Sequence, residues 1–192
     1  AKPVVGNEPF AVLLPDDLIW NTGRGALGQM VDLAEKENAS VISVQEVPHE
    51  QTSSYGIVAA PNFTGRFGVI EQIVEKPKPE VAPSNLAVVG RYVLSGDIFP
   101  ILEKTRSGAG GEIQLTDAIA QLLKQDKVLA YQFEGRRFDC GTRIGLIEAM
   151  ISLVIGASLL TAAAAAYRAT SDAIDANDQF FRATQAARVA VN

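Results

Sequence analysis

Two adjacent carboxylates, Asp16 and Asp17, directly follow the apolar run Phe10–Leu14 and Pro15. A short apolar run bounded by turn residues is typical of a buried strand in an α/β sheet. In such sheets ligands bind beyond the carboxyl ends of the strands, where carboxylate oxygens suit a divalent cation such as magnesium. The pair therefore predicts a site for a metal and a polar substrate. The alternative is an ordinary turn, because Pro and Asp are both common turn residues.

A second pair, Glu75 and Lys76, ends another apolar segment and stands before Pro77. A carboxylate that accepts sugar hydroxyls beside an ammonium that binds phosphate would suit a sugar phosphate. We expect Pro77 to hold Lys76 in extended geometry. Neighbours on a strand point to opposite faces, so both side chains can reach one ligand only at the strand end or loop mouth. The alternative is a solvated charged turn, since surface charge pairs are common.

A third acidic residue, Asp139, lies in the segment Phe138–Gly141, at an expected strand-to-helix turn. A carboxylate there that faces Asp16 would complete a magnesium site with room for water and phosphate oxygens. The adjacent Cys140 has no basic neighbour before Arg143, so the sequence gives no sign of an activated thiolate. We interpret this cysteine as structural.

Two glycine-rich segments could bind phosphate. Gly23–Gly28 has the spacing of the dinucleotide-binding fingerprint, but that fingerprint needs its first glycine immediately after the first strand, and Asp16–Thr22 intervenes here. We therefore reject it. Ser107–Asp117 leads into an expected helix and could offer backbone amides to an anion, but it lacks the ending of a P-loop. Its Thr116 and Asp117 could equally line or cap the helix start.

The composition limits the class of protein. The 192 residues include 47% hydrophobic residues and carry a net charge of -5, which argues against disorder and against a nucleic-acid partner. One cysteine excludes an intramolecular disulfide and fits a reducing, cytoplasmic compartment. With a single histidine, His49, which we expect in a solvated loop, a zinc site of histidines and cysteines is excluded and any metal must be held by carboxylates.

Segments with strand and helix patterns alternate up to about Ala149, which favours βαβ units and an α/β fold with a mixed, mainly parallel sheet flanked by helices. The spacing places a hairpin across the turn at Pro61–Gly65. The expected strands are 10–14, 40–47, 55–58, 68–75, 86–94 and 128–133, and the expected helices are 26–37, 98–104, 115–125 and from 142 onward.

The composition changes near the end of the chain, where residues 150–192 are expected to form an alanine-rich helical tail separate from residues 1–149. The uncharged stretch Met150–Ala166 is slightly shorter than the roughly 20 residues that span a bilayer. A buried helix is therefore favoured over a membrane anchor. We expect the tail to serve packing or subunit contact and the protein to form a homo-oligomer.

Several short motifs, each common alone, occur together in the order and spacing found in bacterial UTP:glucose-1-phosphate uridylyltransferases. The chain resembles that family from Ala1 to about Ala149. The resemblance implies a Rossmann-like nucleotide-diphospho-sugar transferase fold and the reaction of UTP with glucose 1-phosphate to give UDP-glucose and pyrophosphate. The motifs are Leu13–Asp17, Tyr55–Gly56, Val74–Pro77, Ala82–Tyr92, Gly108–Ala118 and Asp139–Gly141.

The resemblance implies a metal site at two of these positions. Asp16 resembles the family's Mg²⁺ ligand, and Asp139 resembles the second acidic position that closes the metal site in related enzymes. The implied mechanism is in-line attack of a glucose 1-phosphate oxygen on the α-phosphorus of UTP. No covalent enzyme intermediate is needed, because positioning and charge neutralisation do most of the catalysis.

The resemblance also implies a sugar-phosphate site. Asp17 and Glu75 resemble acceptors of sugar hydroxyls, and Gly56 resembles a glycine that lets the sugar approach the backbone. Lys76 resembles the contact to the sugar phosphate, and together with Asp16 it is the candidate catalytic residue.

Two nucleotide-binding motifs of the family, Gly-x-Gly-Thr-Arg and a following Pro-Lys-Glu, do not occur in the sequence. The amino terminus has no initiator methionine and no signal pattern, and we expect it to be an interior position of a longer protein. We therefore expect the isolated chain to be inactive. Two alternatives stay open: another sugar-1-phosphate nucleotidylyltransferase, such as a glucose-1-phosphate thymidylyltransferase, or a non-catalytic regulatory subunit that binds sugar nucleotides.

Overall fold

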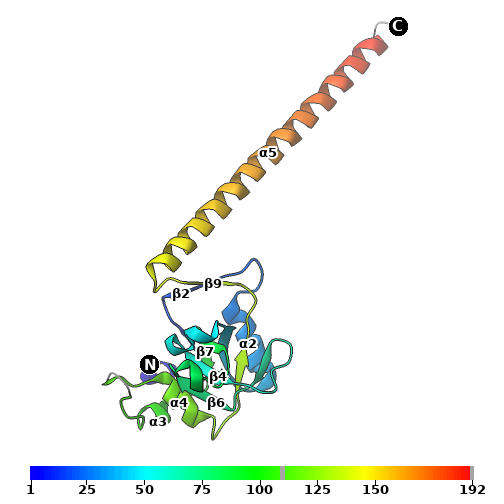
Figure 1. Ribbon diagram of the computed structural model, residues 1–192. Helices are drawn as coiled ribbons and strands as arrows, with labels where there is room; N and C mark the ends of the chain where they lie inside the picture. The colour runs from blue at the N-terminus through cyan, green and yellow to red at the C-terminus, as the bar shows by residue number, and fades with distance from the viewer. Residues whose placement is uncertain (109–110, 191–192) are drawn as a thin grey trace. The chain divides into compact units, whose positions relative to one another are not determined.

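The longest strand, β7 (Leu86–Leu94), is the centre of the main sheet in the computed structural model, which describes residues 1–108 and 111–190 (Figure 1). One edge of β7 pairs with β3 (Ser40–Glu46), and the other edge pairs with both β1 (Phe10–Leu13) and β4 (Gly56–Ala59). Beyond these lie β8 (Val128–Tyr131) next to β3, β5 (Phe67–Val69) next to β8, and β6 (Gln72–Glu75) next to β4.

The α/β class is confirmed, but the expectation of a mainly parallel sheet is wrong. Within the described residues β3 and β8 form the single parallel pair, and the other pairs are antiparallel. The reason lies in the connections. A parallel pair needs a long crossover, usually a helix, and no α-helix separates β4, β5, β6 and β7 along the chain. Apolar runs alone do not reveal which connection follows them.

The expected hairpin forms with one change of partner. β4 pairs with β6, with Gly56 opposite Glu75, as the spacing indicated. The first part of the expected strand 68–75 instead belongs to β5, which pairs with β8. The break falls at Ile70 and Glu71, whose amides donate to Val128 and Ala59, respectively.

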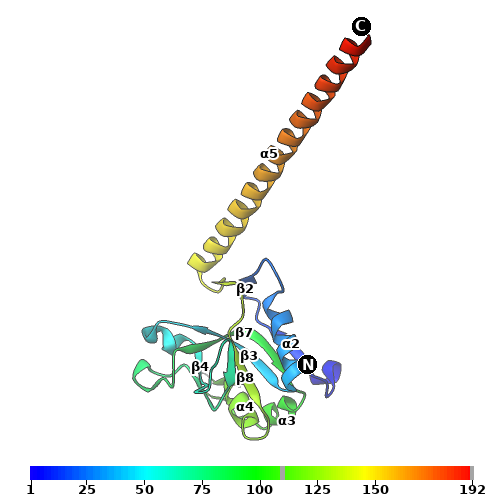
Figure 2. The ribbon, with the colours of Figure 1, turned by 90° about the vertical axis from the view of Figure 1, so that its right-hand side faces the viewer.

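Helices cover both faces of the sheet (Figure 2). Met30 and Leu33 of α2 (Ala26–Glu37) pack with Val41 of β3, whereas Ile119 of α4 (Leu115–Leu122) packs with Ile42. Val41 and Ile42 point to opposite faces because side chains alternate along a strand. The sheet therefore lies between α2 on one face and α4 on the other. The short helix α3 (Ile98–Leu102) packs on the same face as α4 and contributes to the core there.

Short elements complete the first compact unit, Ala1–Gly141. They are α1 (Lys2–Val5) and the 3₁₀ helices η1 (His49–Ser54) and η2 (Pro79–Val81). His49 is exposed, and its ring nitrogen lies 3.0 Å from the Asn85 amide oxygen. A separate two-stranded ribbon joins β2 (Asp17–Trp20) to β9 (Arg136–Asp139), with Asp17 opposite Asp139.

The second unit, Thr142–Asn192, contains one helix, α5 (Arg143–Ala190), which passes through positions 149 and 150 without a break. The expectation of a buried helix is wrong for the described residues, because Met150, Val154 and Leu160 are 58%, 63% and 73% exposed. Apolar residues occur on all sides of the helix, so no single packing face could cover them. Arg143–Asp172 is long and apolar enough to cross a membrane, with a mean hydropathy of 2.0 in its most apolar window.

Candidate active site

The predicted carboxylates lie where β7 changes its partner along one edge. β1 pairs with residues Arg91–Leu94 of β7, and β4 pairs with Leu86 and Ala87. Between these stretches the Gly90 carbonyl accepts a hydrogen bond from the Leu14 amide at 2.9 Å. The chain then leaves the sheet through Pro15 and delivers Asp16 and Asp17 to the gap. This gap lies beyond the carboxyl end of β1, and ligands commonly bind beyond the carboxyl ends of strands in α/β sheets.

Asp17 holds this gap together. Its Oδ2 accepts a hydrogen bond from the Gly90 amide at 2.7 Å, and its Oδ1 accepts one from Arg137 Nε. The Asp17 side chain is 7% exposed and that of Arg137 is 11% exposed, so the carboxylate is buried and the guanidinium is largely buried. The structure thus places Asp17 in the wall of the site with both oxygens engaged. Its contact with a sugar hydroxyl, which would use a remaining lone pair, stays a prediction.

Gly90 is required by the packing around Asp17, although the sequence did not single it out. A Cβ atom there would lie 2.6 Å from Asp17 Oδ2 and 2.8 Å from Leu14 Cβ. Only glycine allows the carboxylate to approach the strand this closely. The signal was present as a glycine inside a strand pattern, which often marks a close approach.

The other two carboxylates, Asp16 and Asp139, lie beside Gly141. A Cβ atom on Gly141 would be 3.2 Å from both Asp16 Oδ2 and Asp139 Oδ1, so these oxygens are no more than twice that distance apart. The Cys140 amide donates to the Asp16 carbonyl at 2.7 Å, and the Gly141 amide donates to Asp139 Oδ1 at 3.1 Å. The start of β2 and the end of β9 therefore bring the two predicted metal ligands together.

This donor set fits magnesium. Over residues 1–108 and 111–190, no group of three or more His, Cys, Asp or Glu side chains could hold a metal ion. Two hard carboxylates are nevertheless the usual protein contribution to a magnesium site, because water and substrate phosphates fill the other positions. Asp16 is exposed and the Asp139 side chain is 36% exposed, so both can be reached from solvent. If a metal is held here, Asp16 and Asp139 would hold it.

A second group forms where β4 pairs with β6. Gly56 lies opposite Glu75, and Thr116 Oγ1 at the start of α4 donates to Glu75 Oε2 at 2.9 Å. A Cβ atom on Gly56 would be 2.8 Å from Thr116 Cγ2 and 3.3 Å from Glu75 Oε2. Glycine is thus required by the fold, because the buried Gly56 packs directly against Thr116 beside the Glu75 carboxylate. Thr116, which the sequence suggested only as a helix-start residue, orients that carboxylate.

Lys76 differs from its sequence-based expectation. We expected extended geometry before Pro77, but Lys76 has a φ of 43°, in the left-handed region. Its amide continues the ladder by donating to the Tyr55 carbonyl at 3.0 Å, and the chain turns sharply after that bond. The turn overrides the preference set by the proline. It also breaks the strand alternation, so that Lys76 Nζ lies 3.8 Å from Glu75 Oε1 while the side chain stays 60% exposed.

Carboxylates of the first group (Asp16 and Asp17) and of the second group (Glu75) act on the same tyrosine. Burial and, to a smaller extent, the negative charges of Glu75, Asp17 and Asp16 together raise the pKa of the Tyr92 hydroxyl to about 12. Carboxylates from both groups thus act on a single phenol of β7. Clustered carboxylates of this kind disfavour further negative charge unless a cation is present. The arrangement suits a ligand that brings phosphate together with a divalent cation.

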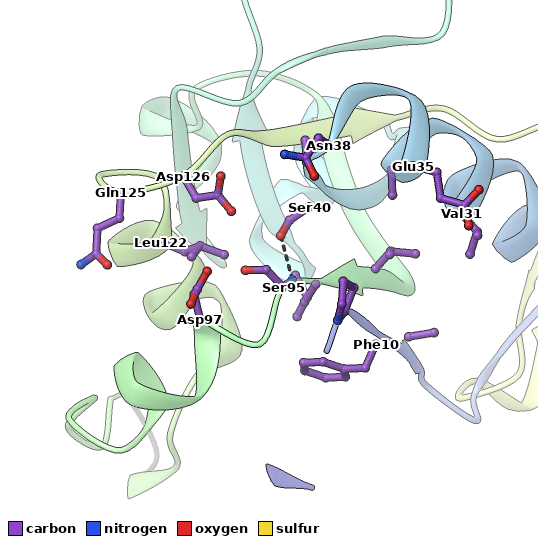
Figure 3. Close-up of a pocket in the computed structure, with 16 residues that line it drawn as sticks. Phe10, Val31, Glu35, Asn38, Ser40, Ser95, Asp97, Leu122, Gln125 and Asp126 are labelled. Atoms are coloured by element: carbon purple, nitrogen blue, oxygen red, sulfur yellow. Dashed lines mark hydrogen bonds between the residues drawn. The ribbon is translucent and has the colours of Figure 1, made fainter. Parts of the chain in front are cut away.

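Two cavities lie elsewhere on the first unit. One, of about 740 Å³, is at the far end of β7, where Ser40 Oγ accepts a hydrogen bond from the Ser95 amide at 3.0 Å (Figure 3). Another, of about 770 Å³, is lined by Ser107, Gly108 and Asp117 of the glycine-rich segment. Neither contains the predicted site residues. Ala109 and Gly110, which belong to the proposed anion-binding loop, lie outside the described residues.

Comparisons with known proteins agree with the motifs. The model of the nucleotidyl transferase family matches residues 1–154. A curated UTP–glucose-1-phosphate uridylyltransferase from Pseudomonas aeruginosa is 50% identical over 149 residues, which are 77% of this chain and 53% of the relative. An apo UDP-glucose pyrophosphorylase structure has a TM-score of 0.78 and 43% identity, covering 81% of this chain and 57% of that one. A UDP-glucose pyrophosphorylase complexed with UDP-glucose has a TM-score of 0.77 and 43% identity, covering 81% and 59%. These similarities confirm the resemblance inferred from the motifs.

Proposed function

The chain belongs to the nucleotidyl transferase family, and we propose that it supplies the metal and sugar-phosphate sites of a UTP:glucose-1-phosphate uridylyltransferase. It spans about half the length of the curated relatives it matches, so the activity is proposed for the longer protein. The observation that carries the proposal is a pair of carboxylates, Asp16 and Asp139, beside Gly141, together with a Glu75 carboxylate whose charge acts with those of Asp16 and Asp17 on Tyr92.

Each residue has a role that its geometry allows. Glu75, oriented by Thr116, accepts sugar hydroxyls, with Asp17 as a second acceptor. Gly56 is proposed as the close-approach glycine beside the sugar. The exposed ammonium of Lys76 binds the phosphate of glucose 1-phosphate as a point charge. With the sugar phosphate fixed, a phosphate oxygen attacks the α-phosphorus of UTP. A new P–O bond forms, the bond to the β-phosphate breaks, and pyrophosphate leaves with the electron pair.

Magnesium is the proposed cofactor, with Asp16 and Asp139 as its protein ligands. When bound there it would neutralise phosphate charge. The remaining catalysis is positioning, because phosphoryl transfer requires little covalent chemistry from the protein. We also propose that the longer protein is a cytoplasmic homo-oligomer with UTP and glucose 1-phosphate as substrates and UDP-glucose as product.

Steady-state assays of the longer protein test this function. UDP-glucose should form from UTP and glucose 1-phosphate only with Mg²⁺, and more efficiently than dTDP-glucose forms from dTTP. Asp16→Asn should lower Mg²⁺-dependent turnover by at least ~100-fold, in line with the loss of a directly acting charge, while leaving the melting temperature nearly unchanged. Asp32→Asn is the matched control, because Asp32 is an exposed α2 carboxylate paired with Arg24. Unchanged turnover of Asp16→Asn across a magnesium titration would remove Asp16 from the site.

The isolated 192-residue chain provides a second test. We propose that it binds UDP-glucose with Mg²⁺ but does not synthesise it, because the nucleotide-binding motifs Gly-x-Gly-Thr-Arg and Pro-Lys-Glu are outside its sequence. Isothermal titration calorimetry measures the binding with and without Mg²⁺, and a pyrophosphate-release assay measures the turnover. Turnover by the isolated chain would contradict the assignment of half the site to the rest of the protein.

A further inference from the structure

Arg137 of β9 is a largely buried cation that contacts Asp17, Asp139 and the Tyr55 ring. Its Nε donates to Asp17 Oδ1, another guanidinium nitrogen is 3.9 Å from Asp139 Oδ2, and its guanidinium carbon lies 5.4 Å from the centre of the Tyr55 ring. Burial lowers the pKa of Arg137, but the Tyr55 hydroxyl and Asp17 outweigh that effect and the net shift is upward. The guanidinium is therefore charged and held on several sides.

The groups that Arg137 contacts come from three different parts of the chain. Asp17 begins β2, Asp139 ends β9, and Tyr55 directly precedes β4. The planar guanidinium presents donors in a fixed fork, so contacts made together define the distances among the partners. Burying a cation is costly, and one ion pair often fails to offset that cost. A buried arginine with this many partners is better explained by specificity of geometry than by stability.

Tyr55 extends this contact to the sugar-phosphate group. Its carbonyl accepts the hydrogen bond from the Lys76 amide at 3.0 Å, at the residue whose φ is positive, and the next residue is Gly56. A shift of Tyr55 would therefore move both Lys76 and Gly56. On the other side, a shift of Arg137 would move Asp139, one of the two proposed metal ligands.

We propose that Arg137, supported by Tyr55, is a positioning residue that fixes the spacing between the Asp16 and Asp139 carboxylates and the Lys76 sugar-phosphate contact. The inference rests on the proposed function. In-line transfer requires the attacking phosphate and the metal-bound nucleotide phosphates to be aligned, and a misplacement of about 1 Å can cost ~100-fold in rate. Arg137 itself, at 11% exposure, need not touch either substrate.

The test uses the longer protein with Arg137→Lys and Tyr55→Phe. Lysine keeps the charge but lacks the fork, and phenylalanine keeps the ring but lacks the hydroxyl. The matched control is Arg136→Gln, because Arg136 is exposed, neighbours Arg137 on β9 and stacks over Phe138 at 4.7 Å. The measurements are kcat, the KM for glucose 1-phosphate, the Mg²⁺ concentration for half-maximal rate, and the melting temperature.

We expect Arg137→Lys to raise the glucose 1-phosphate KM and the half-maximal Mg²⁺ concentration together, each by at least ~5-fold, and to lower kcat by ~10-fold or more. Tyr55→Phe should shift the same quantities in the same direction by ~2- to 5-fold with little change in melting temperature. The double variant should be no worse than Arg137→Lys alone, because both changes break one chain of contacts. The control should match the parent protein.

Other outcomes overturn the inference. Variants that melt earlier but keep the parent kcat, KM and Mg²⁺ dependence would make Arg137 a purely structural residue. A change in only the sugar-phosphate KM or only the Mg²⁺ requirement would show that Arg137 does not join the two groups. If the parent protein itself makes no UDP-glucose, the proposed function fails. If the parent is active and the variants resemble it, the inference alone fails.

Discussion

Lys76 offers a test in which stability and binding should change in opposite directions. A non-glycine residue in the left-handed region costs roughly 1–2 kcal/mol, and Lys76 sits there with a φ of 43°. Lys76→Gly removes this cost, whereas Lys76→Ala keeps it. Glycine in turn loses about 0.5–1 kcal/mol through its extra freedom in the unfolded chain. The ion pair with Glu75 is lost in both variants, so it cancels from the comparison. We therefore expect the glycine variant to be about 1 kcal/mol more stable than the alanine variant.

Trp20, the single tryptophan, reports the unfolding of the first unit, since it lies at the end of β2. Urea titrations followed by its fluorescence give the free energy of unfolding of both variants. Both should also lose affinity for UDP-glucose to the same extent, measured by calorimetry with Mg²⁺, because both lack the ammonium. In ordinary strand or helix positions alanine is the more stable of the two. An alanine variant as stable as the glycine variant would refute the strain at Lys76, and retained affinity would refute its role in binding.

Three further perturbations have definite outcomes. Gly90→Ala should lower the free energy of unfolding by about 1–3 kcal/mol, because its Cβ would meet Asp17 Oδ2 at 2.6 Å; an unchanged urea midpoint would contradict this. Tyr92 has a raised pKa of about 12 in the folded protein. The contribution of its neutral hydroxyl to the free energy of unfolding is therefore fully present below pH 10 and is lost as the pH rises through 12. Tyr92→Phe should remove about 2 kcal/mol of stability loss between pH 9 and pH 11.5, measured from urea midpoints at both pH values; equal losses in both proteins would exclude this effect. The double substitution Leu159→Gln and Leu160→Gln should reduce the binding of a hydrophobic dye, since these side chains are 66% and 73% exposed. The helix signal in circular dichroism should stay unchanged. Unchanged dye fluorescence would show that other surfaces bind the dye.

Elements set by local patterns were predictable from the sequence. Helix α2 was placed at its observed bounds, Ala26–Glu37, because its apolar residues repeat at helical spacing and Asn38 can end a helix with a φ of 46°. Strand β7 was also placed at its bounds, since nine mostly apolar residues form an unbroken run. In both cases the information lies within about a dozen neighbouring residues.

Pairings between distant residues were not predictable in the same way. Arg137 and Asp17 are 120 positions apart, and Gly90 and Asp17 are 73 apart. No periodicity links such residues, so Arg137 and Gly90 were missed although their partner Asp17 was selected. The parallel or antiparallel direction of strands failed for a related reason, because direction depends on the connection rather than on the strand. The Lys76 backbone was misjudged because a tertiary hydrogen bond to Tyr55 outweighs the local effect of Pro77.

The position of the site follows from the way in which β7 satisfies its backbone. A central strand whose partner changes leaves polar groups that must find other partners. At Gly90 the carbonyl finds the Leu14 amide and the amide finds the Asp17 carboxylate, which in turn needs Arg137. The residues that complete the sheet are thus the same residues that hold the ribbon carrying Asp139. Exposed Asp16 and Lys76 can change without disturbing this arrangement, whereas buried Asp17 and Arg137 cannot. Stability and binding should therefore separate at the first pair and stay coupled at the second.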